Sequence, residues 1–86
     1  MAKTKFINPD NFFVSPDILQ NQPLIHLSGT SRLHIENHKG IIEYSPTLVR
    51  VDTTCGIFYV HGRELLVKEI DTTNILVFGE IKSMNY

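Results

Sequence analysis

Two interleaved series of turn residues divide the chain at nearly constant intervals. In the first series the spacings are 17, 16 and 17 residues, and its members are Gly29, Pro46, Gly62 and Gly79. The second series, with spacings of 16 and 18 residues, consists of Gly40, Gly56 and Asn74. Apolar and polar residues alternate between these points, with the period of two that is typical of half-buried strands. The pattern therefore predicts a chain of β-hairpins.

A succession of about eight short strands with regular turns indicates an all-β fold. We expect a small antiparallel β-sandwich built from successive hairpins, and the alternatives are a small barrel or a β-solenoid-like stack. The residues Gly29, Gly62 and Gly79 are predicted to be turn glycines. If the first hairpin has a three-residue loop at Gly29–Ser31, position i lies opposite position 60 − i, and His26 faces His34.

The N-terminal part differs from the rest of the chain. Residues 1–15 lack periodicity, so we expect a flexible N-terminal arm followed by a single all-β domain over residues 16–86. Three apolar residues interrupt the arm, and they are Phe12, Phe13 and Val14. Such residues either pack against the edge of their own domain or dock on a neighbour, which makes them candidate assembly contacts.

Charge and cysteine content exclude some functional classes. The formal net charge of the 86 residues is −1, without a basic block, so a nucleic-acid partner is not expected. Cys55 is the only cysteine, so an intrachain disulfide cannot form, in agreement with a reducing compartment. The sequence contains neither a long apolar run nor a secretion signal, and we expect a cytoplasmic protein.

The candidate chemistry is sparse. His26 and His34 could share a metal ion as cross-strand neighbours, with Glu36 or His38 nearby, but the spacing signature of a zinc site is absent. Cys55 has no basic neighbour in sequence to activate it. We therefore expect no catalytic residue, no metal and no cofactor.

Strand edges and surface remain as candidate sites. An exposed edge can accept a further strand through backbone hydrogen bonds, and the segments Leu24–Leu27 and Ile81–Tyr86 are candidates for such contacts. A ligand-binding or nucleic-acid-binding small barrel is the alternative, in which aromatic residues would stack on the ligand; these residues are Phe58, Tyr59 and Phe78.

Several segments resemble the YabP/YqfC family of sporulation proteins, and the YqfC branch in particular. They are Pro16–Leu19, Gln22–Ile25, Leu33–Tyr44, Gly62–Lys68 and Gly79–Ile81. The most specific part is the motif formed by Ile35, Glu36, Asn37, His38 and Gly40. The longer N-terminal arm and Pro46 depart from the family pattern.

The resemblance implies a non-enzymatic protein made in the mother cell during sporulation and needed for normal development of the spore envelope. It also implies a protein partner, with a membrane protein of the same programme as the expected one, and a homo-oligomer is a further expectation. The family has no agreed catalytic or ligand residues to transfer. From the residues alone, Asn37 and Gly40 are expected to form a turn.

Overall fold

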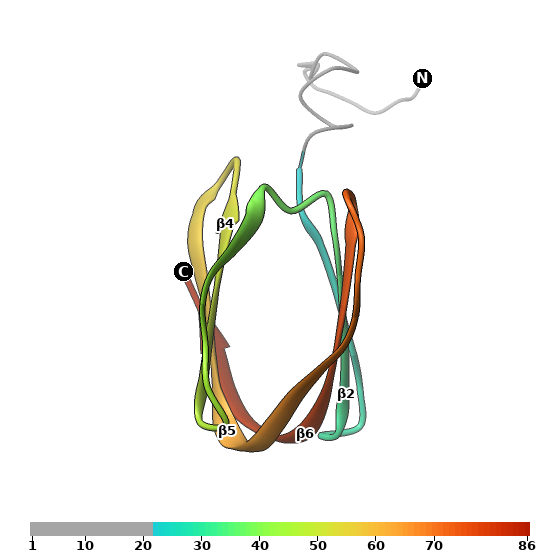
Figure 1. The fold of residues 1–86 in the computed structure, drawn as a ribbon, viewed down its shortest axis with the longest axis vertical. Helices are drawn as coiled ribbons and strands as arrows, with labels where there is room; N and C mark the ends of the chain where they lie inside the picture. Colours follow the sequence, from blue (N-terminus) through green and yellow to red (C-terminus); the bar gives the residue numbers. More distant parts are fainter. Residues whose placement is uncertain (1–21) are drawn as a thin grey trace, which may run out of the picture.

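The computed structural model describes residues 22–86, which form one antiparallel sheet with the strand order β1-β2-β6-β5-β4-β3 (Figure 1). The strands are β1 (Leu24–Ser28), β2 (Arg32–Glu36), β3 (Gly40–Tyr44), β4 (Leu48–Thr53), β5 (Gly56–Ile70) and β6 (Asn74–Asn85). The hairpin of β1 and β2 pairs with β6, and the hairpin of β3 and β4 pairs with β5. Each hairpin is therefore attached to one of the two long strands.

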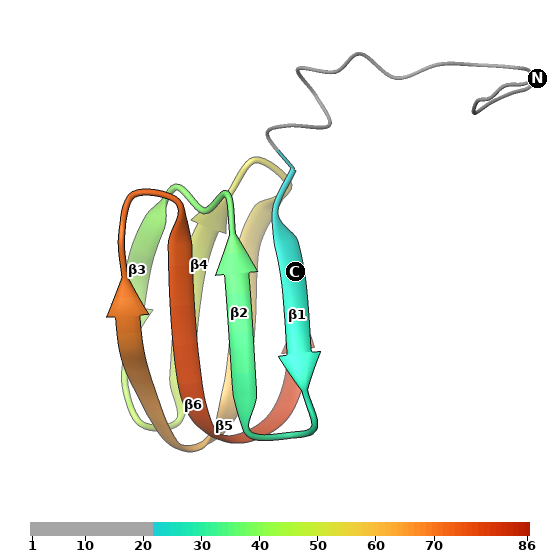
Figure 2. The same cartoon turned by 90° about the vertical axis from the view of Figure 1, so that its right-hand side faces the viewer.

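The long strands β5 and β6 bend midway, so that the sheet has the shape of a U (Figure 1). The first arm contains β1, β2, the first part of β6 and the last part of β5. The second arm contains β3, β4, the first part of β5 and the last part of β6. Figure 2 shows the first arm in front of the second. The two arms face each other across the interior of the U.

Ten buried apolar side chains form one hydrophobic cluster that includes residues of both arms. They alternate along the strands with more exposed residues, as expected for a sheet with one buried face. The cluster consists of Leu33, Ile35, Val49, Val51, Phe58, Val60, Leu65, Ile75, Val77 and Ile81. Burial of this apolar surface is the main stabilising contribution available to a chain without a disulfide.

Gly62 and Gly79 lie inside the long strands, at their bends, and the prediction that both are turn glycines is wrong. A Cβ atom on Gly62 would overlap the carbonyl oxygen of Glu80, and one on Gly79 would lie 2.6 Å from the carbonyl oxygen of Glu64. The strand register shifts at this point, as at a β-bulge. Glycine is required here because two backbones approach closely, and the chain does not reverse.

The tips of the two hairpins are bonded to these bends. Four backbone N–H groups donate to carbonyl oxygens of the tips: Gly79 to Ser31 (3.1 Å), Ile81 to Thr30 (2.8 Å), Gly62 to Thr47 (3.1 Å) and Leu65 to Pro46 (2.8 Å). The arrangement repeats once on each side of the β5–β6 pair. The regular spacing in the sequence thus reflects two tips, at residues 29 and 46, and two bends, at residues 62 and 79.

The prediction of an all-β fold is confirmed, and so is the register of the first hairpin, in which His26 lies opposite His34. About eight strands were predicted, and the described residues form six, because the long strands continue through their glycines. The predicted sandwich of two sheets and the solenoid alternative are not found within residues 22–86, since all the strands there belong to one antiparallel sheet. The sheet is open, because β1 and β3 are its unpaired edges and do not close a barrel. The predicted arm, residues 1–15, lies outside the described residues.

Candidate functional site

The outer strands leave several backbone edges unpaired within residues 22–86. β1 pairs only with β2, and β3 pairs only with β4. The last parts of β5 and β6 each have a single paired neighbour. Large apolar side chains are between 39% and 53% exposed on or beside these strands, namely Leu24, Leu27, Ile42, Tyr44, Leu66, Ile70 and Tyr86. Unpaired edges with exposed apolar side chains are suited to strand addition by a further chain.

A side chain covers one of these edges. The hydroxyl group of Tyr44, on β3, donates to the carbonyl oxygen of Leu65 (3.4 Å) and accepts from the backbone N–H of Val67 (3.3 Å). Both backbone groups belong to the last part of β5, so Tyr44 joins the second arm to the first. This residue was not identified from the sequence, because its contact depends on the bend in β5.

The segment from Ile35 to Gly40, which carries the motif predicted from the sequence, lies at the end of β2 and in the loop that leads from the first arm to the second. Ile35 is fully buried in the core, and Glu36 ends β2. Asn37 has a φ of 65° and Gly40 a φ of 127°, and the side-chain amide of Asn37 donates to the carbonyl oxygen of Gln22. The expected turn of Asn37 and Gly40 is present, but it links two arms and does not close a hairpin.

His38 holds the loop between β2 and β3 in place. Its Nδ1 accepts a hydrogen bond from the N–H of Gly40 (2.9 Å), which leaves Nε2 as the donor to the carbonyl oxygen of Asp71 (2.8 Å). Two further backbone hydrogen bonds hold the same loop: the N–H of Asn37 donates to the carbonyl oxygen of Thr73, and the N–H of Lys39 donates to that of Asp52. The role of the motif in this structure is therefore to connect the loops at the open end of the U.

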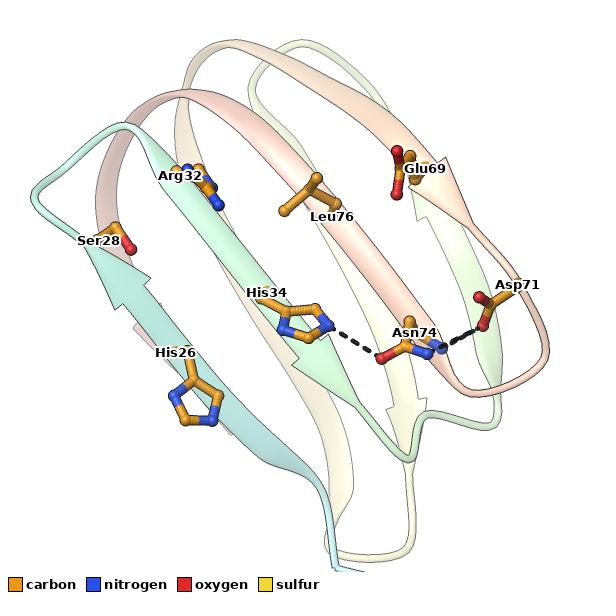
Figure 3. Close-up of a pocket in the computed structure, with 8 residues that line it drawn as sticks. All are labelled: His26, Ser28, Arg32, His34, Glu69, Asp71, Asn74 and Leu76. Carbon is orange, nitrogen blue, oxygen red and sulfur yellow. Dashed lines mark hydrogen bonds between the residues drawn. The ribbon is translucent and has the colours of Figure 1, made fainter.

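A shallow hollow of about 350 Å³ lies on the outer face of the first arm (Figure 3). It is lined by His26, Ser28, Arg32, His34, Glu69, Asp71, Asn74 and Leu76. Several of its polar groups already bond to one another, since His34 Nε2 lies 2.9 Å from Asn74 Oδ1 and Asp71 Oδ1 accepts from the N–H of Asn74 (2.7 Å). The hollow thus contains an internal hydrogen-bond network.

Asp71 is fixed by the loop between β5 and β6. Its carboxylate accepts backbone hydrogen bonds from Thr73 (2.9 Å) and Asn74 (2.7 Å), and these bonds lower the pKa of Asp71 below its usual value. The sequence identifies this loop as polar, but it does not show that the loop lies beside His34. That proximity follows from the pairing of β2 with β6, which no local pattern reveals.

The two histidines considered as metal ligands lie side by side, with ring centroids 6.2 Å apart. Within residues 22–86, no group of three or more histidine, cysteine or acidic side chains is placed to hold a metal ion. Cys55 is exposed in the turn between β4 and β5. Among the aromatic residues considered for stacking, Phe58 is only 5% exposed, so its ring belongs to the core. The predicted assembly residues Phe12, Phe13 and Val14 lie outside the described residues.

The part of the chain that the structure describes contains no helix long and apolar enough to cross a membrane. Comparison with protein families matches residues 20–86 to the YabP family. The chain is also 30% identical, over 73 residues, to the uncharacterized protein YqfC of Bacillus subtilis strain 168. That similarity covers 85% of this chain and 78% of the Bacillus protein.

Proposed function

This chain belongs to the YabP family, and on that premise we propose that it is a non-enzymatic sporulation protein that works through contacts of its sheet edges with other protein chains. Family membership suggests the link to sporulation. The proposed place of action is the cytoplasm of the mother cell, and the proposed process is development of the spore envelope. The expected partners are a membrane protein of the same programme and further copies of the chain.

The observation that supports this mechanism is the combination of unpaired backbone and exposed apolar side chains on the outer strands. On β1, for example, Leu24 is 46% exposed and Leu27 is 39% exposed. Strand addition uses main-chain hydrogen bonds for affinity and alternate side chains for specificity. Both requirements are met at such an edge.

A ligand-binding module is the alternative, and the hollow on the first arm is the observation in its favour. Its walls carry one arginine, two histidines and two carboxylates. The hydrogen bonds among His34, Asn74 and Asp71 count against it, because a ligand would have to replace them. Nucleic acid is a weaker alternative for a chain of net charge −1.

The test is genetic, in the sporulating host that encodes this chain. Deletion of the gene is expected to lower the number of heat-resistant spores, and expression of the wild-type chain from a mother-cell promoter to restore it. Expression of Leu27→Lys, which places a charge on the β1 edge, is expected not to restore the spore count. Thr72→Lys adds the same charge to an exposed residue in the loop between β5 and β6, away from the strand edges, and is the control. An unchanged spore count after deletion would contradict the role in sporulation, and full rescue by Leu27→Lys would contradict the edge mechanism.

A further inference from the structure

The four unpaired edges differ in how well they are protected against strand addition. β3 has a register shift between Ile41 and Glu43, and the latter is charged. The last part of β5 has two register shifts, contains Lys68 and Glu69, and is bonded to Tyr44. The last part of β6 follows Lys82 and pairs over three residues only. Bulges, charges and short length are the usual means by which a sheet edge avoids association.

β1 has neither a bulge nor a charged residue. Its five residues, Leu24–Ser28, contain no charge and no proline, and they pair with β2 without a register shift. Figure 2 shows β1 at the side of the first arm. β1 is therefore the edge of the described sheet that is most open to a further strand.

The order of residues in β1 also fits a second copy of itself. If two β1 strands pair antiparallel around His26, Ile25 of each copy lies opposite Leu27 of the other, and Leu24 lies opposite Ser28. Ile25 and Leu27 are on the inner face, because they lie opposite the buried residues Ile35 and Leu33. Apolar residues then meet apolar residues, no acidic residue, lysine or arginine of β1 faces its own copy, and the inner faces of both sheets remain on the same side.

We propose that β1 is a self-pairing edge, through which two copies of this chain form a dimer with two-fold symmetry and His26 of one copy beside His26 of the other. This inference rests on the proposed function, since it names the strand and the partner for the edge contact. Pairing of identical strands is a closed arrangement, so it stops at two copies. Pairing of β1 with β3 would be open-ended, and the bulge and Glu43 of β3 disfavour it.

Cross-linking of single cysteines tests this register. In a Cys55→Ser background, which removes the exposed native thiol, His26→Cys is expected to form a disulfide-linked dimer on mild oxidation. Directly opposed residues have Cα atoms about 4.5 to 5.5 Å apart, within the range of a disulfide. Ser28→Cys in the same background is the matched control, because its two copies would be about 13 Å apart along the strands and should stay unlinked.

Light scattering on the full-length chain gives the second measurement. The wild type is expected to have twice the monomer mass of 9.8 kDa, and Leu27→Lys to have the monomer mass. Thr72→Lys, in the exposed loop between β5 and β6, is expected to remain a dimer. Circular dichroism shows whether each variant is folded. If Leu27→Lys fails to fold, the comparison of cross-linking between the His26→Cys and Ser28→Cys variants still tests whether β1 pairs with its own copy. A monomeric wild type, or equal cross-linking of His26→Cys and Ser28→Cys, would overturn the proposal.

The outcomes also separate this inference from the proposed function. A monomeric wild type with a spore defect in folded Leu27→Lys would mean that the edge serves a different protein, so that only the self-pairing fails. A monomer whose β1 amides are protected from hydrogen exchange would mean that the chain covers its own edge, which also overturns self-pairing. An unchanged spore count after gene deletion would refute the sporulation role whatever the measured mass.

Discussion

Gly62 lies against the carbonyl oxygen of Glu80 so closely that the two backbones leave no room for a Cβ atom. Gly62→Ala is therefore expected to destabilise the protein by about 2 kcal/mol or more, because one of the long strands must shift at its bend. Urea unfolding measures this loss. Gly29→Asn is the control, since a Cβ there meets nothing within 4 Å and asparagine tolerates the φ of 60°. Equal losses in both variants would contradict the close approach at the bend.

Tyr44→Phe removes the hydroxyl group that joins β3 to β5. We expect a loss of about 1 kcal/mol in the free energy of unfolding, the usual net contribution of such hydrogen bonds. The amide of Val67 should also exchange faster with solvent, since its acceptor is lost. Tyr59→Phe deletes the same atom from a ring that stacks on His61, and it is the control. Unchanged exchange at Val67 would show that the bridge is not formed in solution.

His38→Ala removes the acceptor of the Gly40 N–H and the donor to the Asp71 carbonyl oxygen. Because two backbone groups lose their partners, the expected destabilisation is about 1 to 2 kcal/mol by chemical denaturation. His61→Ala is the comparison, since His61 is exposed on β5. Equal destabilisation by the two substitutions would contradict the proposed role of His38 in holding the loop between β2 and β3.

Because the pKa of Asp71 is lowered in the folded chain, we expect the stability of the protein to depend on pH. The N–H groups of Thr73 and Asn74 bond to the carboxylate and lower the pKa of Asp71 in the folded chain. The contribution of Asp71 to stability is thus complete above the pKa that its carboxyl group has in the unfolded chain. This contribution is lost as the pH falls through the lower pKa that the same group has in the folded chain. Unfolding measured from about pH 5 down to about pH 2 should show this loss, and Asp71→Asn should reduce the slope. A carboxyl titration by NMR at or above the ordinary value would disprove the shift.

Local patterns in the sequence predict the two hairpins well. The spacing around Gly29 gives the opposition of His26 and His34, because a hairpin loop fixes the register of the strands beside it. The same reasoning misreads Gly62 and Gly79, since glycine is required both where a chain turns and where two backbones approach. Which of the two applies depends on a neighbour that is distant in sequence.

The candidate site was predictable only in part. The segment Leu24–Leu27 is identified from the sequence as an edge, and β1 is indeed an edge of the sheet. The bridge made by Tyr44 and the network of His34 with Asn74 depend on contacts between segments 21 or more residues apart. Such contacts follow from the bend and from the pairing of β2 with β6, and neither has a local signature.

The attachment of the first hairpin to β6 also bears on the order of folding. β2 pairs with Asn74–Phe78 of β6, the last of the described strands in sequence order, so the second edge of β2 has no neighbour until β6 has been synthesised. Long-range pairing of this kind slows folding, because the entropy of a large loop is lost before the contacts form. During that interval β2 presents both of its inner residues, Leu33 and Ile35, to the surroundings. The nascent chain is then expected to be most prone to aggregate, or to require a chaperone, before β6 is made.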